Sequence, residues 1–140
     1  MTTVTINDEG TRRSVLFAIW EHAAAEIGED FYDALHLEAR ASCERAGPSQ
    51  IPWFHLVSGE MALMQSTAAA AAAVQTAGVG QTVDIDVPEA ALAHGLSACS
   101  AQIAEDEGFW LKEGDERDRD LATFDAAQAL IRDLDREAVA

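Results

Sequence analysis

The sequence predicts a mainly α-helical domain: a bundle of about five helices around a central alanine-rich helix, with two short strands pairing at one end. One observation is the uncharged run Met61–Val83 in a chain whose formal net charge is −16. A second is the return of apolar residues every three or four positions, which indicates amphipathic helices. A third is a pair of short alternating stretches, typical of strands. Residues 1–140 are expected to form a single acidic helical domain with one core.

The alanine-rich segment is expected to form the central helix. From Leu56 to Ala77 the chain has no proline and a single glycine, and alanine, leucine and methionine are strong helix formers. A helix without charge beyond Glu60 is normally buried. The alanines of Ala68–Ala73 would let neighbouring helices approach closely. Gly78 or Gly80 is the predicted helix end.

Elements before this helix follow from pattern and breakers. Thr2–Asn7 alternates β-branched and polar residues and predicts a strand. A first helix is expected from about Thr11 to Ile27, ending at Gly28. A second is expected from about Glu29 to Ala46, before the breaker Gly47–Pro52.

Elements after the central helix repeat this order. Gln81–Val87 alternates again and predicts a second strand that pairs with the first. Pro88 suits the first position of a fourth helix. The apolar stripe of that helix comprises Leu92, Leu96, Cys99 and Ile103. A fifth helix is expected to start near Asp115 and to run close to the C-terminus.

The segment from Glu105 to Asp120 is the most charged part of the chain and holds two adjacent aromatic residues. Aromatic side chains ringed by charge are a common composition of binding hot spots. The alternative is that these aromatics pack onto the core. The predicted binding residues are Glu105, Asp106, Glu107, Phe109, Trp110, Glu113, Asp115, Glu116, Asp118 and Asp120.

The negative net charge bears on the class of partner. Such a chain repels nucleic acid and anionic membranes, so neither is expected to bind directly. A basic protein partner is expected instead. The predicted function is therefore a non-enzymatic acidic binding protein, such as a phage- or plasmid-type inhibitor that occupies a basic nucleic-acid-binding groove of its partner. Two simpler explanations of the acidity are solubility and a salt-rich or high-GC source.

Two alternative functions remain open. A self-associating structural module would form a homo-oligomer through the Ala68–Ala73 helix. A small helical metalloprotein would use His22 with Glu26, four residues apart, and Asp33 with His36, three apart. Each pair supplies only two ligands, and neither spacing occurs a second time to supply the others. No metal or other cofactor is therefore predicted. The sequence has no nucleophile elbow, phosphate loop or dinucleotide fingerprint, which favours a non-enzymatic protein without excluding catalysis.

The expected location is the cytoplasm. The first residues lack the pattern of a secretory signal. Cys43 and Cys99 are too few for a disulfide framework and are expected to be buried thiols in a reducing compartment. A membrane span is not expected, because polar residues such as Gln65 and Gln75 interrupt a run of weakly apolar alanine.

Overall fold

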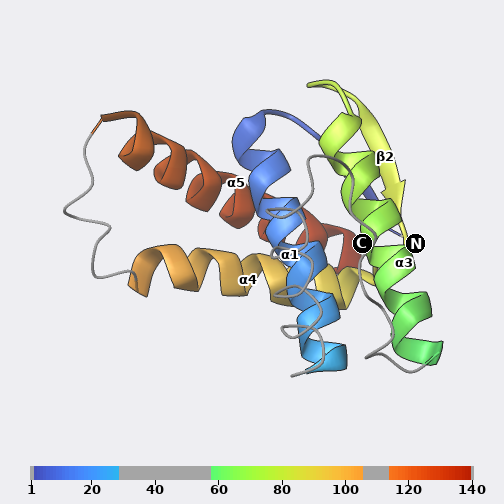
Figure 1. Cartoon of the computed structure of the whole chain (residues 1–140). Helices are drawn as coiled ribbons and strands as arrows, with labels where there is room; N and C mark the ends of the chain where they lie inside the picture. Colours follow the sequence, from blue (N-terminus) through green and yellow to red (C-terminus); the bar gives the residue numbers. More distant parts are fainter. Residues whose placement is uncertain (1, 29–57, 106–113, 140) are drawn as a thin grey trace, which may run out of the picture.

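The computed structural model describes residues 2–28, 58–105 and 114–139 (Figure 1). The elements in chain order are β1 (Thr2–Thr5), α1 (Glu9–Ile27), α3 (Ser58–Thr76), β2 (Thr82–Ile85), α4 (Glu89–Glu105) and α5 (Gly114–Val139). The mainly α prediction is confirmed, with four packed helices rather than five among the described residues. The helix predicted from about Glu29 to Ala46 lies outside the described residues.

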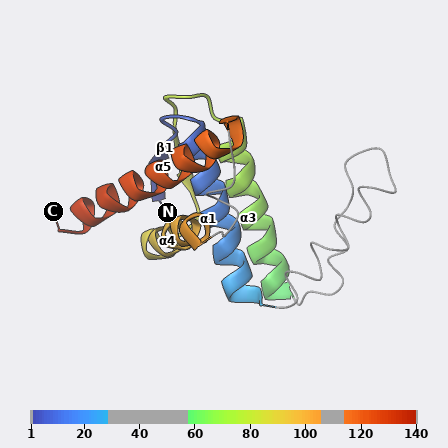
Figure 2. The ribbon, with the colours of Figure 1, turned by 90° about the vertical axis from the view of Figure 1, so that its left-hand side faces the viewer.

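The helix at the centre of the described fold is α1 and not the alanine-rich α3. Helix α1 packs against α3, α4 and α5, whereas the main contacts of α3 are with α1 and β2. Figure 2 shows α3 beside α1 at the outside of the bundle. Among the described helices, the alanine-rich helix is therefore not the central one that the sequence predicted. The physical reason is that an uncharged helix need not be buried all round: Ala62, Ala69 and Ala72 are exposed, and exposing a methyl group costs little.

The two strands pair, as predicted, in one antiparallel sheet. Thr2 lies opposite Ile85, and Thr5 lies opposite Thr82. Both strands are shorter than the alternating patterns that predict them. The Thr2 hydroxyl donates to the carbonyl of Val87, which fixes the start of the chain beside the entrance to α4.

A tight turn and a β-bulge set where β2 begins. The N–H of Gln81 donates to the Gly78 carbonyl at 3.0 Å, and Gly80 has φ +90°, as the third residue of a type II turn requires. Gly80 and Gln81 then face a single residue of the other chain segment: the Gly80 N–H donates to the Ile6 carbonyl at 2.7 Å, and the Ile6 N–H donates to Gln81 at 2.9 Å. Two residues opposite one is the definition of a bulge, so regular pairing starts only at Thr82.

Helix boundaries follow local capping. The Asp8 carboxylate accepts hydrogen bonds from the Thr11 N–H at 2.7 Å and from the Thr11 hydroxyl at 2.9 Å. Asp8 is thus the N-cap, and α1 starts at Glu9, two residues before the predicted start at Thr11. Pro88 stands directly before the first residue of α4, in agreement with the expected helix start there.

Arg12 joins α1 to the C-terminal end of α3. One guanidinium nitrogen donates to the carbonyls of Val74, Gln75 and Ala77 at 2.7, 3.0 and 2.6 Å. The last carbonyls of a helix have no partner within the helix and carry its negative dipole end. Since the last turn of α3 contains no basic residue, a cation from α1 performs this capping.

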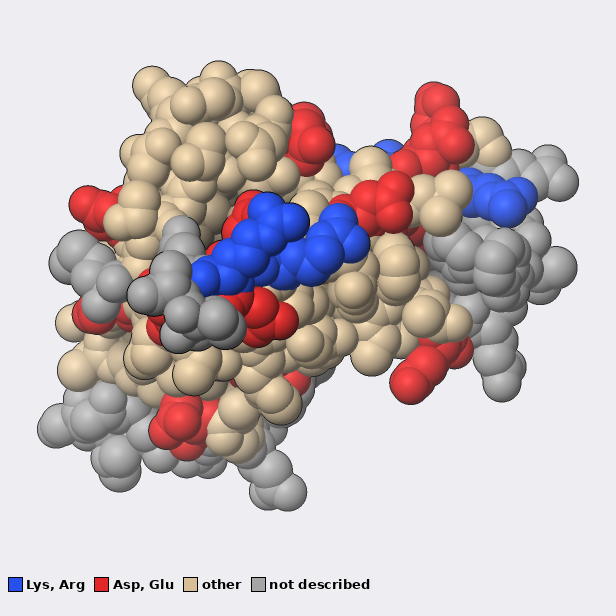
Figure 3. Space-filling view, turned by 180° about the vertical axis from the view of Figure 1, so that it is seen from behind, with Lys and Arg blue, Asp and Glu red and all other residues tan. Residues whose placement is uncertain are grey.

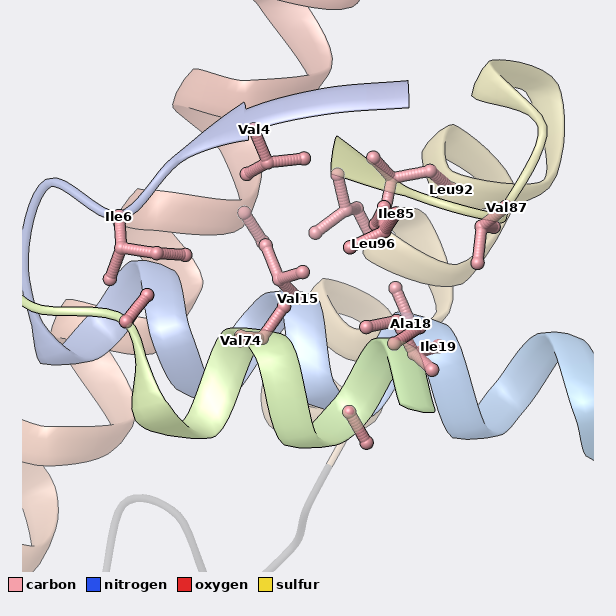
Figure 4. Packing of buried hydrophobic residues seen from close by; sticks show 14 residues of the cluster. Val4, Ile6, Val15, Ala18, Ile19, Val74, Ile85, Val87, Leu92 and Leu96 are labelled. Carbon is pink, nitrogen blue, oxygen red and sulfur yellow. The ribbon is translucent and has the colours of Figure 1, made fainter. Parts of the chain in front are cut away.

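The core lies where α1, α4 and the sheet meet (Figure 4). Its labelled members in that view are Val4, Ile6, Val15, Ala18, Ile19, Val74, Ile85, Val87, Leu92 and Leu96. The helices α1 and α4 approach each other closely at Gly95, where a Cβ atom would lie 2.7 Å from the Cα of Ala18. The predicted stripe of α4 is buried at Leu92, Leu96 and Cys99, and half-buried at Ile103.

Candidate functional site

The predicted acidic segment meets the described structure at two helix ends. Glu105 is the last residue of α4, while Asp115, Glu116, Asp118 and Asp120 lie in the first two turns of α5. Figure 1 shows both ends on the same side of the molecule, away from the sheet. The remaining predicted binding residues lie outside the described residues: Asp106, Glu107, Phe109, Trp110 and Glu113.

A groove of about 570 Å³ lies between α1, α4 and α5 beside these ends. Its lining comprises Arg13, Phe17, Cys99, Gln102, Ile103, Glu105, Asp120 and Thr123. The structure therefore brings two of the predicted residues, Glu105 and Asp120, to one groove. The volume falls within the range of about 300–1,000 Å³ that is usual for sites that enclose a ligand.

Arg13 is fixed against the α5 wall of this groove. Its Nε donates to the Thr123 hydroxyl at 2.9 Å, and a terminal nitrogen donates to the Arg119 carbonyl at 3.3 Å. Thr123 in turn donates to the same Arg119 carbonyl at 2.8 Å. The guanidinium is thus held by α5. Among the described residues that line the groove, Arg13 is the one basic group, and Glu105 and Asp120 are acidic. The lining therefore carries an excess of negative charge.

Apolar and sulfur-containing side chains complete the lining of the groove. The Cys99 side chain is buried, as predicted, and burial raises the pKa of its thiol to about 11, with a smaller contribution from the negative charge of Asp120. A thiol with this pKa stays protonated near neutral pH and is a poor nucleophile. Cys99 is therefore suited to packing with Phe17 and Ile103 rather than to covalent chemistry. Cys43 lies outside the described residues.

The start of α5 carries basic as well as acidic side chains. Asp115, Glu116 and Asp118 are exposed and Asp120 is half-buried, but the exposed Arg119 stands among them. On the face shown in Figure 3, arginine side chains form a band across the middle with acidic side chains beside it, and uncharged residues cover much of the rest. Successive residues of a helix point about 100° apart. Asp120 therefore lines the groove, while Asp115, Glu116 and Asp118 are exposed and do not line it.

Sequence reasoning did not identify most of the groove lining. Arg13 and Phe17 belong to α1, Gln102 to α4 and Thr123 to α5, and no spacing along the chain relates the three helices. The charge of Glu105 and Asp120 was the available signal, and it pointed to part of the lining only.

Of the two pairs considered for metal binding, the structure describes only one. His22 is half-buried and Glu26 is exposed, both on α1, while Asp33 and His36 lie outside the described residues. Across residues 2–28, 58–105 and 114–139, no three His, Cys, Asp or Glu side chains gather in a way that could hold a metal ion.

No protein-family model, curated protein or solved structure matches this chain. Among the described helices, none combines the length and the apolar character needed to cross a membrane.

Proposed function

We propose that this chain is a non-enzymatic binding protein that recognises a basic protein partner through an acidic end. The acidic end consists of Glu105, Asp115, Glu116, Asp118 and Asp120. The observation that carries the proposal is the groove between α1, α4 and α5, whose lining includes Glu105 and Asp120. The other three carboxylates precede Asp120 in the first two turns of α5.

The groove suits a lysine or arginine side chain. Such side chains have an apolar stem and a charged head, and they bury the stem while the head stays polar. Phe17 and Ile103 offer apolar surface for the stem, and Glu105 and Asp120 give the groove negative charge that would attract the head. The Nε of Arg13 donates to the Thr123 hydroxyl at 2.9 Å, and this bond holds the positive charge of Arg13 against α5.

The exposed carboxylates of the acidic end would act at longer range. Surface charges steer association and are screened over about 8–10 Å at physiological salt. A partner with a dense basic groove, such as a protein that binds nucleic acid, would gain most from a chain of net charge −16. An inhibitor of phage or plasmid type that occupies such a groove is the form of this function that we propose.

The test is a pull-down from bacterial lysate at low and moderate salt, followed by mass spectrometry. We expect the wild type to recover a basic nucleic-acid-binding protein at low salt and to release it at moderate salt. A variant that neutralises Glu105, Asp115, Glu116 and Asp118 should lose the partner. A control variant that neutralises the same number of carboxylates elsewhere, at Glu21, Glu26, Glu89 and Asp135, should keep it.

If both variants lose the partner equally, binding depends on net charge alone, which would contradict a localised acidic site. For the recovered partner, a further measurement is competition: the chain should displace a nucleic-acid oligomer from it. Simultaneous binding of chain and oligomer would contradict the proposed inhibition.

A second candidate function is self-association through α3. Its outward face is uncharged and exposed at Ala62, Gln65, Ala69, Ala72 and Thr76, which recur at intervals of three and four. Sedimentation of the wild type should then show an oligomer, and Ala69→Arg should dissociate it. A monomeric wild type rejects this candidate. Ala70 is unsuitable for the test because it is buried and a larger side chain would disturb the fold.

A further inference from the structure

The outer edge of β1 leaves backbone groups without a partner strand. The Ile6 N–H donates to Gln81 on the β2 side, and in an antiparallel pair the N–H and C=O groups of successive residues alternate in direction. The backbone N–H and C=O groups of Val4 therefore also face β2, while those of Thr3 and Thr5 point to the opposite side. Within the described residues, no hydrogen bond engages these outward backbone groups.

Two adjoining cavities lie between the N-terminal segment and α5: the smaller borders β1, and the larger borders Asn7, Asp8 and Thr11 around the start of α1. Their volumes are about 250 and 340 Å³, and they share Asn7, Leu130 and Asp133 in their linings. Thr3 and Thr5 line the smaller cavity on the β1 side, opposite Leu130 on α5. The backbone edge thus borders the smaller cavity, and Leu130 contributes apolar surface to both cavities.

The charged side chains among the described residues that line this space are all acidic. Asp8, Asp125 and Asp133 line the two cavities, and no Lys or Arg of residues 2–28, 58–105 or 114–139 lines them. Asp8 already caps α1, so Asp125 and Asp133 are the carboxylates that an occupant would meet. Asp133 lies 3.8 Å from Arg136 in an exposed pair, and exposed pairs of this kind are weak enough for a second cation to compete.

The charge selects the occupant. A second copy of this chain would add another net charge of −16 and would bring like charges together at the edge. A segment with lysine or arginine side chains would be attracted instead. An unpaired strand edge is a template for one further strand, and main-chain hydrogen bonds then supply affinity.

We propose that the outer edge of β1 binds an extended basic segment of a partner protein as a third strand. The backbone of that segment pairs with Thr3 and Thr5, and its lysine or arginine side chains face Asp125 and Asp133. This surface is separate from the groove between α1, α4 and α5, so the inference does not rest on the proposed function.

The probe is a short synthetic peptide that alternates lysine and valine, added to the isotope-labelled full chain. Amide hydrogen exchange followed by NMR should slow at Thr3 and Thr5. The Val4 amide faces β2, so the peptide should change its exchange less. A peptide that alternates glutamate and valine should leave Thr3 and Thr5 unprotected. Equal protection by the two peptides would overturn the charge argument.

A pair of substitutions at one position separates backbone pairing from side-chain effects. Thr3→Pro removes the outward N–H and is compatible with an edge strand, and it should weaken peptide binding about tenfold. Thr3→Val keeps the N–H and loses only the 2.6 Å hydrogen bond of the hydroxyl to Asp84. It should bind the lysine peptide as the wild type does. Unchanged binding by a folded Thr3→Pro variant would refute strand addition.

A second pair of variants leaves β1 intact. Asp133→Asn should weaken lysine-peptide binding about two- to fivefold. Asp135→Asn removes an exposed carboxylate from the same helix that lines neither cavity, and it should have no effect. Equal effects of the two substitutions would overturn the placement of the basic side chains. Protection of Thr3 and Thr5 that rises with protein concentration, without peptide, would assign the edge to a second copy instead.

Discussion

Gly95 is the position where a single added methyl group tests the packing of the bundle. A Cβ atom there would lie 2.7 Å from the Cα, 2.8 Å from the Cβ and 2.9 Å from the carbonyl oxygen of Ala18. Favourable contacts between carbon atoms lie at about 3.5–4.0 Å. Two of the three atoms belong to the backbone of α1, so no side-chain rotation relieves the overlap, and α1 and α4 must separate.

Two opposing terms set the size of the effect of Gly95→Ala. Alanine is favoured over glycine within a helix by about 1 kcal/mol. Overpacking a core costs about 1–3 kcal/mol, and backbone atoms place this site at the upper end. The net loss of unfolding free energy is then about 2 kcal/mol. For 140 residues, an unfolding entropy of about 0.3 kcal/mol per kelvin converts this loss to a fall in Tm of about 7 °C.

The assay is thermal and urea unfolding of Gly95→Ala followed by circular dichroism. Ser97→Ala is the control, because Ser97 is exposed on the same helix and should stay within about 0.5 kcal/mol of the wild type. Adding Ala18→Gly to Gly95→Ala removes one of the three contacts and should recover part of the loss. A Gly95→Ala variant with a raised Tm would show that helix propensity prevails, which refutes the close α1–α4 crossing.

Two further outcomes follow from the structure. Arg12→Met removes the guanidinium that caps α3 and should lower the unfolding free energy by about 1.5–3 kcal/mol in urea; a comparable loss in the exposed Arg132→Met would argue against a specific cap. Because the pKa of Cys99 is raised from 9.0 to about 11, the unfolded chain ionises first, so stability should fall as pH rises between these values. Unfolding titrations of Cys99→Ala should lack this part of the decline, and an identical decline would contradict the raised pKa.

Local sequence patterns predicted the elements well because the cause of each element is local. The alternation in Thr2–Asn7 and Gln81–Val87 reflects one buried and one exposed face, and the two segments do pair. The boundary of β2 was missed because it depends on a contact with Ile6, which is distant in sequence. No pattern within the glycine-rich turn shows that Gly80 and Gln81 will face that one residue.

Charge alone did not predict which helix is the most buried. The alanine-rich helix carries no charge after Glu60, yet part of its surface is exposed, while α1 carries Arg12 and Arg13 and still lies at the centre. Long cationic side chains can reach the rim of a core while their stems stay packed. Arg12 ends at the α3 carbonyls and Arg13 at Thr123, so the charges on α1 serve as bridges to its neighbours.

The acidic residues of the candidate sites either recognise a partner or only keep the surface soluble. A purely solubilising charge would make any two exposed carboxylates of α5 equivalent. The structure makes them unequal, because Asp133 lines both cavities between the N-terminal segment and α5, and Asp135 lines neither. Comparing these two substitutions therefore separates a recognition role from a solvating one. If the two variants differ in lysine-peptide binding, the position of a carboxylate on α5 determines recognition. If they bind equally, the net charge of −16 acts only as an overall property of the surface.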